Sequence, residues 1–206
     1  MRPGDVVWFD GEPVEPEPLE YHLLNKPTGV ISAVSDSRGQ RTVTELVPSR
    51  ARLFPVGRLD RDTTGLIILT NDGVLAHSLM HPRFEVDKVY RAEIEGAPTE
   101  AELKRLRNGV RLEDGVTAPA EAKLIGVAGK GGPKAGGAGG LAVVELSIHE
   151  GRKRQVRRML EAVGHTAVRL HRKKYAMLTD SGLAEGDSRP LTDREIKALR
   201  KLAGSK

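Results

Sequence analysis

The chain is 206 residues long, contains no cysteine and carries a formal net charge of +5 at pH 7, so it can form one large or two small domains but no disulfide, thiolate metal site or thiol nucleophile. No apolar stretch approaches the roughly 20 residues that cross a bilayer, and no signal-peptide region opens the chain, so we expect a cytoplasmic protein without a membrane partner. The excess of Lys and Arg instead predicts a polyanionic partner.

The first 18 residues predict a short β-hairpin followed by a linker. Asp10-Gly11 is a two-residue turn signal between stretches that suit strands. Alternating Glu and Pro follow in residues 15–18, a composition typical of linkers. Because the segment is too short to be a domain, we interpret it as the end of a unit that precedes the main domain.

Apolar patterning and capping residues predict four elements between residues 20 and 82. These are a strand over 20–25, a short helix begun by the Thr42/Glu45 pair, a buried strand over 66–69, and a helix that Asn71 or Asp72 caps and that ends before Pro82.

The rest of the chain predicts irregularly interleaved strands and helices. The strands cover 89–95, 141–148 and 167–170, and the helices run from the Thr99/Glu102 pair to near Gly109, over 156–163 up to Gly164, and from Thr192 to near Gly204. The Gly-rich segment 130–140 lacks the spacing of a phosphate-binding loop and predicts a flexible hairpin tip. Without a repeat or a strict βαβ alternation, the predicted class is α+β.

Charge gathers immediately before the apolar run 66–69, where Arg58, Asp60, Arg61 and Asp62 follow one another closely. A single Asp in a turn is usually a cap, but here Asp62 and Asp72 can fill that role. A neighbouring arginine favours the charged form of a carboxylate, which a nucleophile needs. We therefore select Asp60 as the candidate nucleophile.

Tyr90 lies between cations in Lys88-Val89-Tyr90-Arg91, in a chain with only three tyrosines, three phenylalanines and one tryptophan. An aromatic ring flanked by positive charges suits a nucleic-acid base stacked on the ring with phosphates beside it. An ordinary strand tyrosine packed in the core explains the pattern equally well, so both interpretations stay open on this residue alone.

The segment 151–175 holds nine Lys and Arg residues and one acidic residue, a local charge of +8. Solvated helix faces usually mix signs, so this concentration favours phosphate binding. Arg157 and Arg158 are adjacent and project about 100° apart on a helix, so one can face an internal carboxylate while the other faces RNA. His77 and His81 have metal-ligand spacing, but no third ligand accompanies them, and we predict no metal site.

Together these segments resemble the RsuA-type family of pseudouridine synthases that modify ribosomal RNA. The resemblance spans about residues 20 to 200 and rests on four ordered motifs: Leu-Leu-Asn-Lys-Pro-Thr-Gly-Val at 23–30, the charged motif at 57–73, His81-Pro82 with Lys88-Val-Tyr90, and Glu150-Gly-Arg…Gln155-Val-Arg-Arg-Met159. Val163-Gly164 and the stretch from Leu170 to Arg172 continue it.

The resemblance implies the pseudouridine synthase fold, a mixed and largely antiparallel sheet with flanking helices and a central RNA-binding cleft. It also implies isomerisation of a specific uridine in ribosomal RNA by a monomer that needs no cofactor, because the uracil ring itself carries the electrons. Asp60 then attacks ribose C1′, removes the C2′ proton or, in an older proposal, adds at uracil C6.

Other roles follow from the same motifs. Tyr90 matches the tyrosine that stacks on the target base, Arg157 matches the basic residue that pairs with the aspartate, and Leu170 matches an apolar wall under the uracil. Arg58 matches a side chain that fills the hole left by the flipped base, for which a planar cation is suited. We expect the remaining RNA contacts from Arg61, Lys88, Arg152, Arg154, Arg158, Arg172, Lys173 and Lys174.

The family usually carries a small N-terminal S4-type RNA-binding domain, and residues 4–14 resemble only its end. We therefore expect residues 1–18 to be a remnant of such a domain plus a linker, and residues 19–206 to be the catalytic domain. A non-catalytic RNA-binding factor for ribosome assembly with the same fold is the alternative function. A carboxylate-dependent glycosidase is disfavoured because no second carboxylate stands out as the proton donor.

Overall fold

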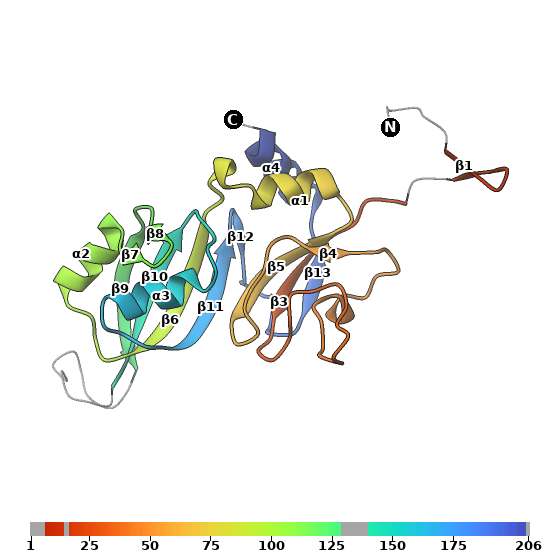
Figure 1. The fold of residues 1–206 in the computed structure, drawn as a ribbon. Helices are drawn as coiled ribbons and strands as arrows, with labels where there is room; N and C mark the ends of the chain where they lie inside the picture. The colour runs from red at the N-terminus through yellow and green to blue at the C-terminus, as the bar shows by residue number, and fades with distance from the viewer. Residues whose placement is uncertain (1–6, 15–16, 129–139, 205–206) are drawn as a thin grey trace.

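The computed structural model describes residues 7–14, 17–128 and 140–204. Within these ranges the helices are α1 (Gly73–Met80), α2 (Glu100–Asn108), α3 (Gln155–Ala162) and α4 (Asp193–Gly204), with 3-10 turns at Thr44–Leu46 and Pro82–Phe84. The strands are β1 (Val7–Phe9), β2 (Glu12–Val14), β3 (Tyr21–Lys26), β4 (Phe54–Pro55), β5 (Thr64–Thr70), β6 (Lys88–Glu95), β7 (Arg111–Leu112), β8 (Gly115–Val116), β9 (Glu121–Ala128), β10 (Leu141–Ile148), β11 (Ala167–Tyr175), β12 (Leu178–Thr179) and β13 (Ser188–Pro190) (Figure 1).

One mixed sheet runs through the length of the molecule. Its main path is β13-β3-β5-β11-β6-β10-β9, with β4 added to β5 and β12 added to β11. All of its pairings are antiparallel except the one between β5 and β11. This confirms the predicted α+β class with a mixed, largely antiparallel sheet and flanking helices.

The parallel contact between β5 and β11 joins the two halves of the sheet over two residue pairs, Thr64 with His171 and Gly65 with Arg172. Gly65 has φ +112°, and a Cβ there would lie 2.4 Å from the backbone oxygen of Arg172, so only glycine permits this approach. Side chains reinforce the contact: Thr64 Oγ1 and Asp180 Oδ2 each lie 2.8 Å from a ring nitrogen of His171.

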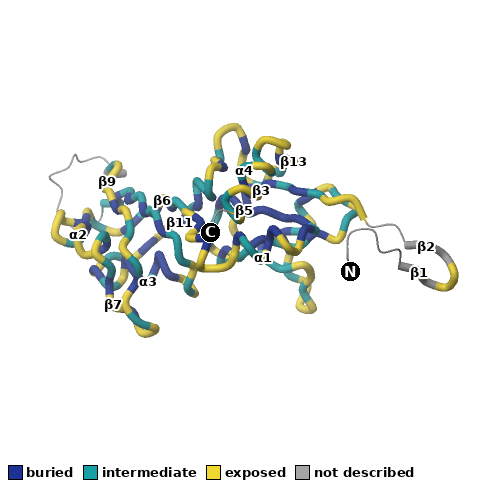
Figure 2. The backbone as a smooth tube through the Cα atoms, turned by 90° about the horizontal axis from the view of Figure 1, so that it is seen from above, coloured by how far each residue is buried: buried dark blue, intermediate teal, exposed yellow. Residues whose placement is uncertain are grey.

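Helices cover the sheet from both sides, so the apolar run of β5 is buried on both faces. Leu66 and Ile68 pack with α1 and α4, whereas Ile67 and Leu69 belong to the larger core that includes α2 and α3. Figure 1 shows α1 and α4 together over one half of the sheet and α2 and α3 over the other. Figure 2 shows burial following the central strands while the loops are exposed.

Local capping signals predicted the helix starts. Asp72, one of the two candidate caps, accepts a hydrogen bond from the backbone N–H of Leu75 at the start of α1. The Thr99/Glu102 pair forms a complete capping box at α2. The expected helix after Thr42 is only the 3-10 turn Thr44–Leu46, because the Glu45 carboxylate accepts from Thr42 and holds a single turn before Pro48.

Two expectations concern the ends of elements. The strand predicted over 167–170 continues to Tyr175 as β11, which takes Arg172 into the sheet. The predicted N-terminal hairpin is present as β1 and β2, with Asp10-Gly11 between them. The origin of this hairpin in an S4-type domain stays a prediction. Most of the Gly-rich segment, residues 130–139, lies outside the described residues.

None of the helices in the described ranges combines the length and hydrophobicity that crossing a bilayer needs.

Gly65→Ala should lower the free energy of unfolding by about 2–5 kcal/mol, because the methyl group collides with the backbone of β11 and the φ angle is strained. Urea denaturation followed by circular dichroism measures this. Gly126→Ala is the matched control, since Gly126 also lies in a strand but no atom lies within 4 Å of its added Cβ. Equal stability of the two variants would show that β5 and β11 tolerate a wider spacing.

Candidate active site

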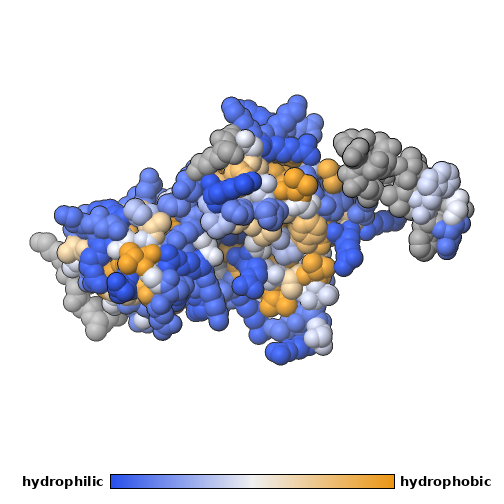
Figure 3. All heavy atoms as spheres, turned by 45° about the horizontal axis from the view of Figure 1, so that its top comes forward, coloured by the Kyte–Doolittle hydropathy of each residue, from blue (hydrophilic) through white to orange (hydrophobic). Residues whose placement is uncertain are grey.

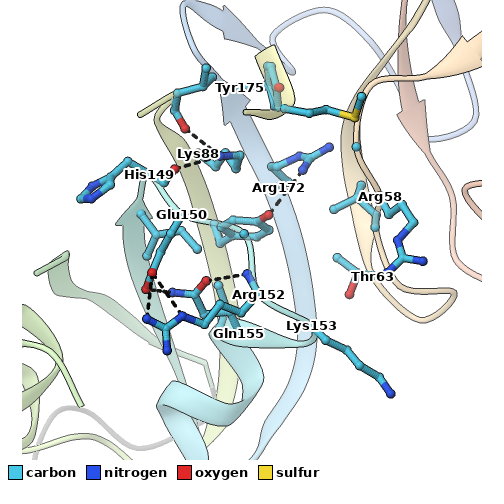
Figure 4. A pocket seen from close by; sticks show the side chains of 18 of the residues that line it. Arg58, Thr63, Lys88, His149, Glu150, Arg152, Lys153, Gln155, Arg172 and Tyr175 are labelled. Carbon is cyan, nitrogen blue, oxygen red and sulfur yellow. Dashed lines mark hydrogen bonds and ion pairs between the residues drawn. The ribbon is translucent and has the colours of Figure 1, made fainter. Parts of the chain in front are cut away.

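A cavity of about 420 Å³ opens where the two halves of the sheet meet. One wall is the segment 57–63 before β5, and the opposite wall comes from β6, β11 and the turn that leads into α3 (Figure 4). Predicted site residues from all these segments line it: Arg58, Asp60, Lys88, Tyr90, Arg152, Arg154, Leu170 and Arg172. Arg157, Arg158, Arg61, Lys173 and Lys174 are not among the lining residues.

The Asp60 segment is held in place by the loop that follows β3. The hydroxyl of Ser32 donates to the carbonyl of Leu59 at 2.9 Å and accepts from the N–H of Leu59 at 3.0 Å. The backbone N–H of Gly29 donates to the carbonyl of Arg61 at 2.8 Å. These contacts fix both sides of Asp60 while its carboxylate stays accessible, with 36% of the side chain exposed.

Lys26 anchors the same loop from inside the protein. Its side chain is fully buried, and its ammonium donates to the carbonyls of Pro27 and Val30 at 2.9 and 2.8 Å, with Arg61 O at 3.4 Å. Burial lowers its pKa to about 8, while Asp62, Glu185 and Asp60 act in the opposite direction. Lys26 belongs to the motif at 23–30, but the sequence predicted no role for this residue.

The two carboxylates of the segment share Arg154 at the start of α3, and Asp62 also binds Arg157. Arg154 lies 3.8 Å from the Asp60 carboxylate and 3.5 Å from that of Asp62. Arg157 is buried and forms its ion pair with Asp62 at 3.1 Å, while it also donates to the carbonyl of Ala167 at 2.7 Å. The expected pairing of Arg157 with Asp60 is therefore corrected: Asp62 is the residue of this segment that faces Arg157.

Tyr90 and Leu170 form the apolar part of the opposite wall. Tyr90 is 8% exposed on β6, and Leu170 lies on the adjacent strand β11, opposite Ala92. Both predicted environments of Tyr90 are thus present, because the ring belongs to the larger core and also lines the cavity. A planar base in the cavity would meet this ring and the leucine side chain.

Arg172 was expected at the RNA surface, but it is 2% exposed and lies beside the rings of Tyr90 and Tyr175. Its Nε donates to the carbonyl of Leu66 at 2.7 Å, and its guanidinium carbon lies 5.1 Å from the centre of the Tyr175 ring. A side chain enclosed in this way cannot contact a phosphate from the surface, so the expected RNA contact of Arg172 is wrong.

Several other side chains that were expected to contact RNA bind acceptors within the protein instead. Arg152 and Arg158 both bind Asp114 in the β7–β8 turn, at 3.4 and 2.9 Å. The ammonium of Lys88 donates to the carbonyls of Val86 and His149, and that of Lys173 binds Glu145 at 3.0 Å. These contacts weaken the prediction of phosphate binding that rests on the local charge of residues 151–175, because the cations already bind acceptors within the protein.

Arg58 and Arg61 remain exposed on the Asp60 segment, and Arg58 faces the cavity in Figure 4. Lys174 is partly exposed, and no ion pair to it is found in the described part of the chain. On the face shown in Figure 3, hydrophilic residues cover most of the surface and hydrophobic ones form small separate groups. Arg154 is also exposed and lines the cavity, although it lies near the carboxylates of Asp60 and Asp62, so these four cations keep the predicted access to a polyanion.

Glu150 and Gln155 organise the turn that enters α3. The Glu150 carboxylate accepts from the backbone N–H of Ala118 and from the amide of Gln155, and it pairs with Arg152 at 3.1 Å. The amide oxygen of Gln155 accepts from the backbone N–H of Arg152 at 2.9 Å. The sequence motif contained both residues, but only their proximity in the fold shows that they shape the cavity wall.

Comparison with known proteins agrees with this fold and cavity. The family model described as RNA pseudouridylate synthase matches residues 20–162. Ribosomal large subunit pseudouridine synthase B of Bacillus subtilis (strain 168) is 48% identical over 201 residues, which are 97% of this chain and 79% of that protein. Ribosomal large subunit pseudouridine synthase E of Vibrio vulnificus (strain CMCP6) is 38% identical over 169 residues, or 80% and 72% of the two chains.

A crystal structure of a pseudouridylate synthase superimposes with a TM-score of 0.76 at 32% identity and covers 97% of this chain and 82% of that one. The fold is thus that of an RNA-modifying isomerase. The chain belongs to the RNA pseudouridylate synthase family, and the resemblance to its RsuA-type members is confirmed.

The free energy of unfolding should depend on pH through the ammonium group of Lys88. Burial, and after it the positive charge of Arg172, lowers the pKa of Lys88 from 10.5 to about 8. Between these values the unfolded chain binds the proton more tightly than the folded one, so this contribution to stability rises as the pH increases from about 8 towards 10.5.

Lys88→Met removes this contribution. The difference in unfolding free energy between the native protein and the variant, measured by urea denaturation from pH 7 to 10, should shift in favour of the native protein with rising pH. Lys26 and Tyr175 titrate in both proteins and cancel in the difference. Parallel stability curves would contradict the lowered pKa of Lys88.

Proposed function

We propose that this chain isomerises a specific uridine in ribosomal RNA to pseudouridine, with Asp60 as the nucleophile and the target base flipped into the cavity. The observation that carries the proposal is the meeting of Asp60, Tyr90, Leu170 and Arg58 around one cavity, although they come from three separate parts of the chain. The two relatives named as ribosomal large subunit enzymes support ribosomal RNA as the substrate.

The reaction moves one bond without net oxidation or reduction. The bond between ribose C1′ and uracil N1 breaks, a bond between C1′ and C5 forms, C5 loses its proton, and the ring nitrogen that has left the sugar gains one. The Asp60 carboxylate either attacks C1′ to form a covalent intermediate or removes the C2′ proton to give a glycal. In both routes it must be ionised and must reach the sugar.

Arginines at the start of α3 lie beside both aspartates of the segment. Arg154 lies close enough to the Asp60 carboxylate to attract it electrostatically, and Arg157 neutralises Asp62, which would otherwise place a second negative charge two residues away. In the free protein, Arg157 therefore acts on Asp60 only indirectly, by neutralising the charge of Asp62.

A flipped base needs a pocket and a substitute in the helix it leaves. Tyr90 and Leu170 offer an aromatic and an aliphatic surface to the uracil, and the exposed Arg58 stands at the edge of the cavity. Its planar guanidinium can stack in the vacated position and bind a phosphate at the same time, which offsets part of the cost of about a few kcal/mol for unstacking.

Asp60→Asn should abolish pseudouridine formation in a ribosomal RNA fragment and leave RNA binding nearly unchanged, because the amide keeps the shape but not the nucleophilic charge. Single-turnover assays with chemical mapping of pseudouridine measure the first property, and filter binding measures the second.

Asp62→Asn is the matched control, because it removes the same charge two residues further along. It should slow the reaction but retain activity, since it loosens Arg157 and leaves Asp60 intact. If Asp60→Asn stays fully active, Asp60 is not the nucleophile, and inactivity of Asp62→Asn in that case would assign the role to Asp62.

Lys174→Ala should lower the slope of log affinity against log salt concentration by about one unit if Lys174 contacts a phosphate. Lys173→Ala should change the slope less, because Glu145 already holds the Lys173 ammonium. Measuring RNA affinity between low and moderate salt compares these neighbours directly. An unchanged slope in Lys174→Ala would remove β11 from the RNA-binding surface.

A further inference from the structure

We propose that Arg172 is a positioning residue that holds the Tyr90 hydroxyl at the cavity and ties it to the strand that follows the Asp60 segment. The inference deepens the proposed function, because it rests on the role of Tyr90 in that reaction. It replaces the RNA-surface role that the sequence suggested for Arg172, which its burial excludes.

The contacts of Arg172 connect the two walls of the cavity. On one side, its Nε donates to the carbonyl of Leu66 in β5 at 2.7 Å. On the other side, its Nη1 donates to the Tyr90 hydroxyl oxygen at 3.4 Å, the dashed line that ends at Arg172 in Figure 4. The guanidinium carbon lies 6.0 Å from the Tyr90 ring centre and 5.1 Å from that of Tyr175, so the cation is placed between two aromatic rings.

The direction of the hydrogen bond gives Arg172 its effect on Tyr90. A guanidinium only donates, so the Tyr90 oxygen must accept from it and keeps its own O–H for another partner. Because Tyr90 lines the cavity, that partner can be the substrate. A lysine could not replace this function fully, since it lacks the fixed fork that reaches two acceptors in different strands.

Two further observations indicate that Arg172 does more than fill the core. Its Nη2 is buried and finds no hydrogen-bond partner within the described residues, which is costly for a charged donor and uncommon in a purely structural side chain. Its backbone lies opposite Gly65 on one side and Tyr90 on the other. Arg172 therefore stands between the strand that continues from the Asp60 segment and the strand that carries Tyr90.

The test is a double-mutant cycle with Arg172→Met and Tyr90→Phe, using single-turnover rates and KM on the ribosomal RNA fragment. We expect Arg172→Met to lower the rate by about tenfold or more, as for a lost hydrogen bond to a charged group, with little change in KM. If Arg172 acts through Tyr90, the double variant should be no slower than the slower single variant. Arg172→Lys, which keeps the charge, should recover part of the rate.

Tyr175→Phe is the control, because it removes a hydroxyl on the far side of Arg172 that donates to the carbonyl of Leu79. It should affect thermal stability and combine additively with Tyr90→Phe in rate. If Arg172→Met does not fold, the cycle with Arg172→Lys decides the question.

Multiplied rate losses in the Arg172 and Tyr90 cycle would overturn the inference. Full activity of Tyr90→Phe would overturn it as well, because Tyr90 would then have no hydroxyl function for Arg172 to support. Neither result affects Asp60, whose role fails only if Asp60→Asn stays active, so failure of this inference is distinguishable from failure of the proposed function.

Discussion

The cavity exists because β5 and β11 approach each other closely over two residue pairs and then diverge. Gly65 makes this approach possible, since any side chain there would meet the backbone of Arg172. The Asp60 segment ends directly before this point, while β11 continues beside β6 and Tyr90. The distance between Asp60, the proposed nucleophile, and the aromatic wall is therefore set by backbone packing at the centre of the sheet. Rigid strands hold such geometry more precisely than loops can.

Internal pairing also explains why a chain with so much positive charge in one segment can fold compactly. Asp114 neutralises Arg152 and Arg158, Asp62 neutralises Arg157, and Glu145 lies between Lys123 and Lys173. The pairs with Asp114 join the β7–β8 turn to α3 and the turn that precedes it, and the pair with Asp62 joins α3 to the Asp60 segment. The exposed Arg58 lines the cavity, where a polyanion can reach it.

Local chemistry predicted the helix starts at Asp72 and Thr99, because a cap depends on neighbours three residues away. Asp60, Tyr90 and Leu170 were predicted as one site only through motif resemblance, since periodicity does not show which strands become neighbours. The prediction failed for Arg172. The sequence after Leu170 reads as polar, but β11 continues with a register shift between Arg172 and Lys174, which buries both Arg172 and Tyr175. A bulge of this kind depends on the partner strand, so the sequence of β11 alone does not reveal it.

The unequal pairing of Asp60 and Asp62 with arginines has a consequence for the proposed mechanism. A carboxylate bound tightly by an arginine is ionised, but its oxygens are occupied, and it would have to break those bonds to reach a ribose. Here the tight pair belongs to Asp62, at 3.1 Å from Arg157, whereas the nearest arginine nitrogen to Asp60 lies 3.8 Å away. Arginine therefore occupies the oxygens of Asp62 more closely than those of Asp60. In the proposed mechanism the two aspartates divide the work, because Asp62 anchors α3 and Asp60 is left to reach the sugar.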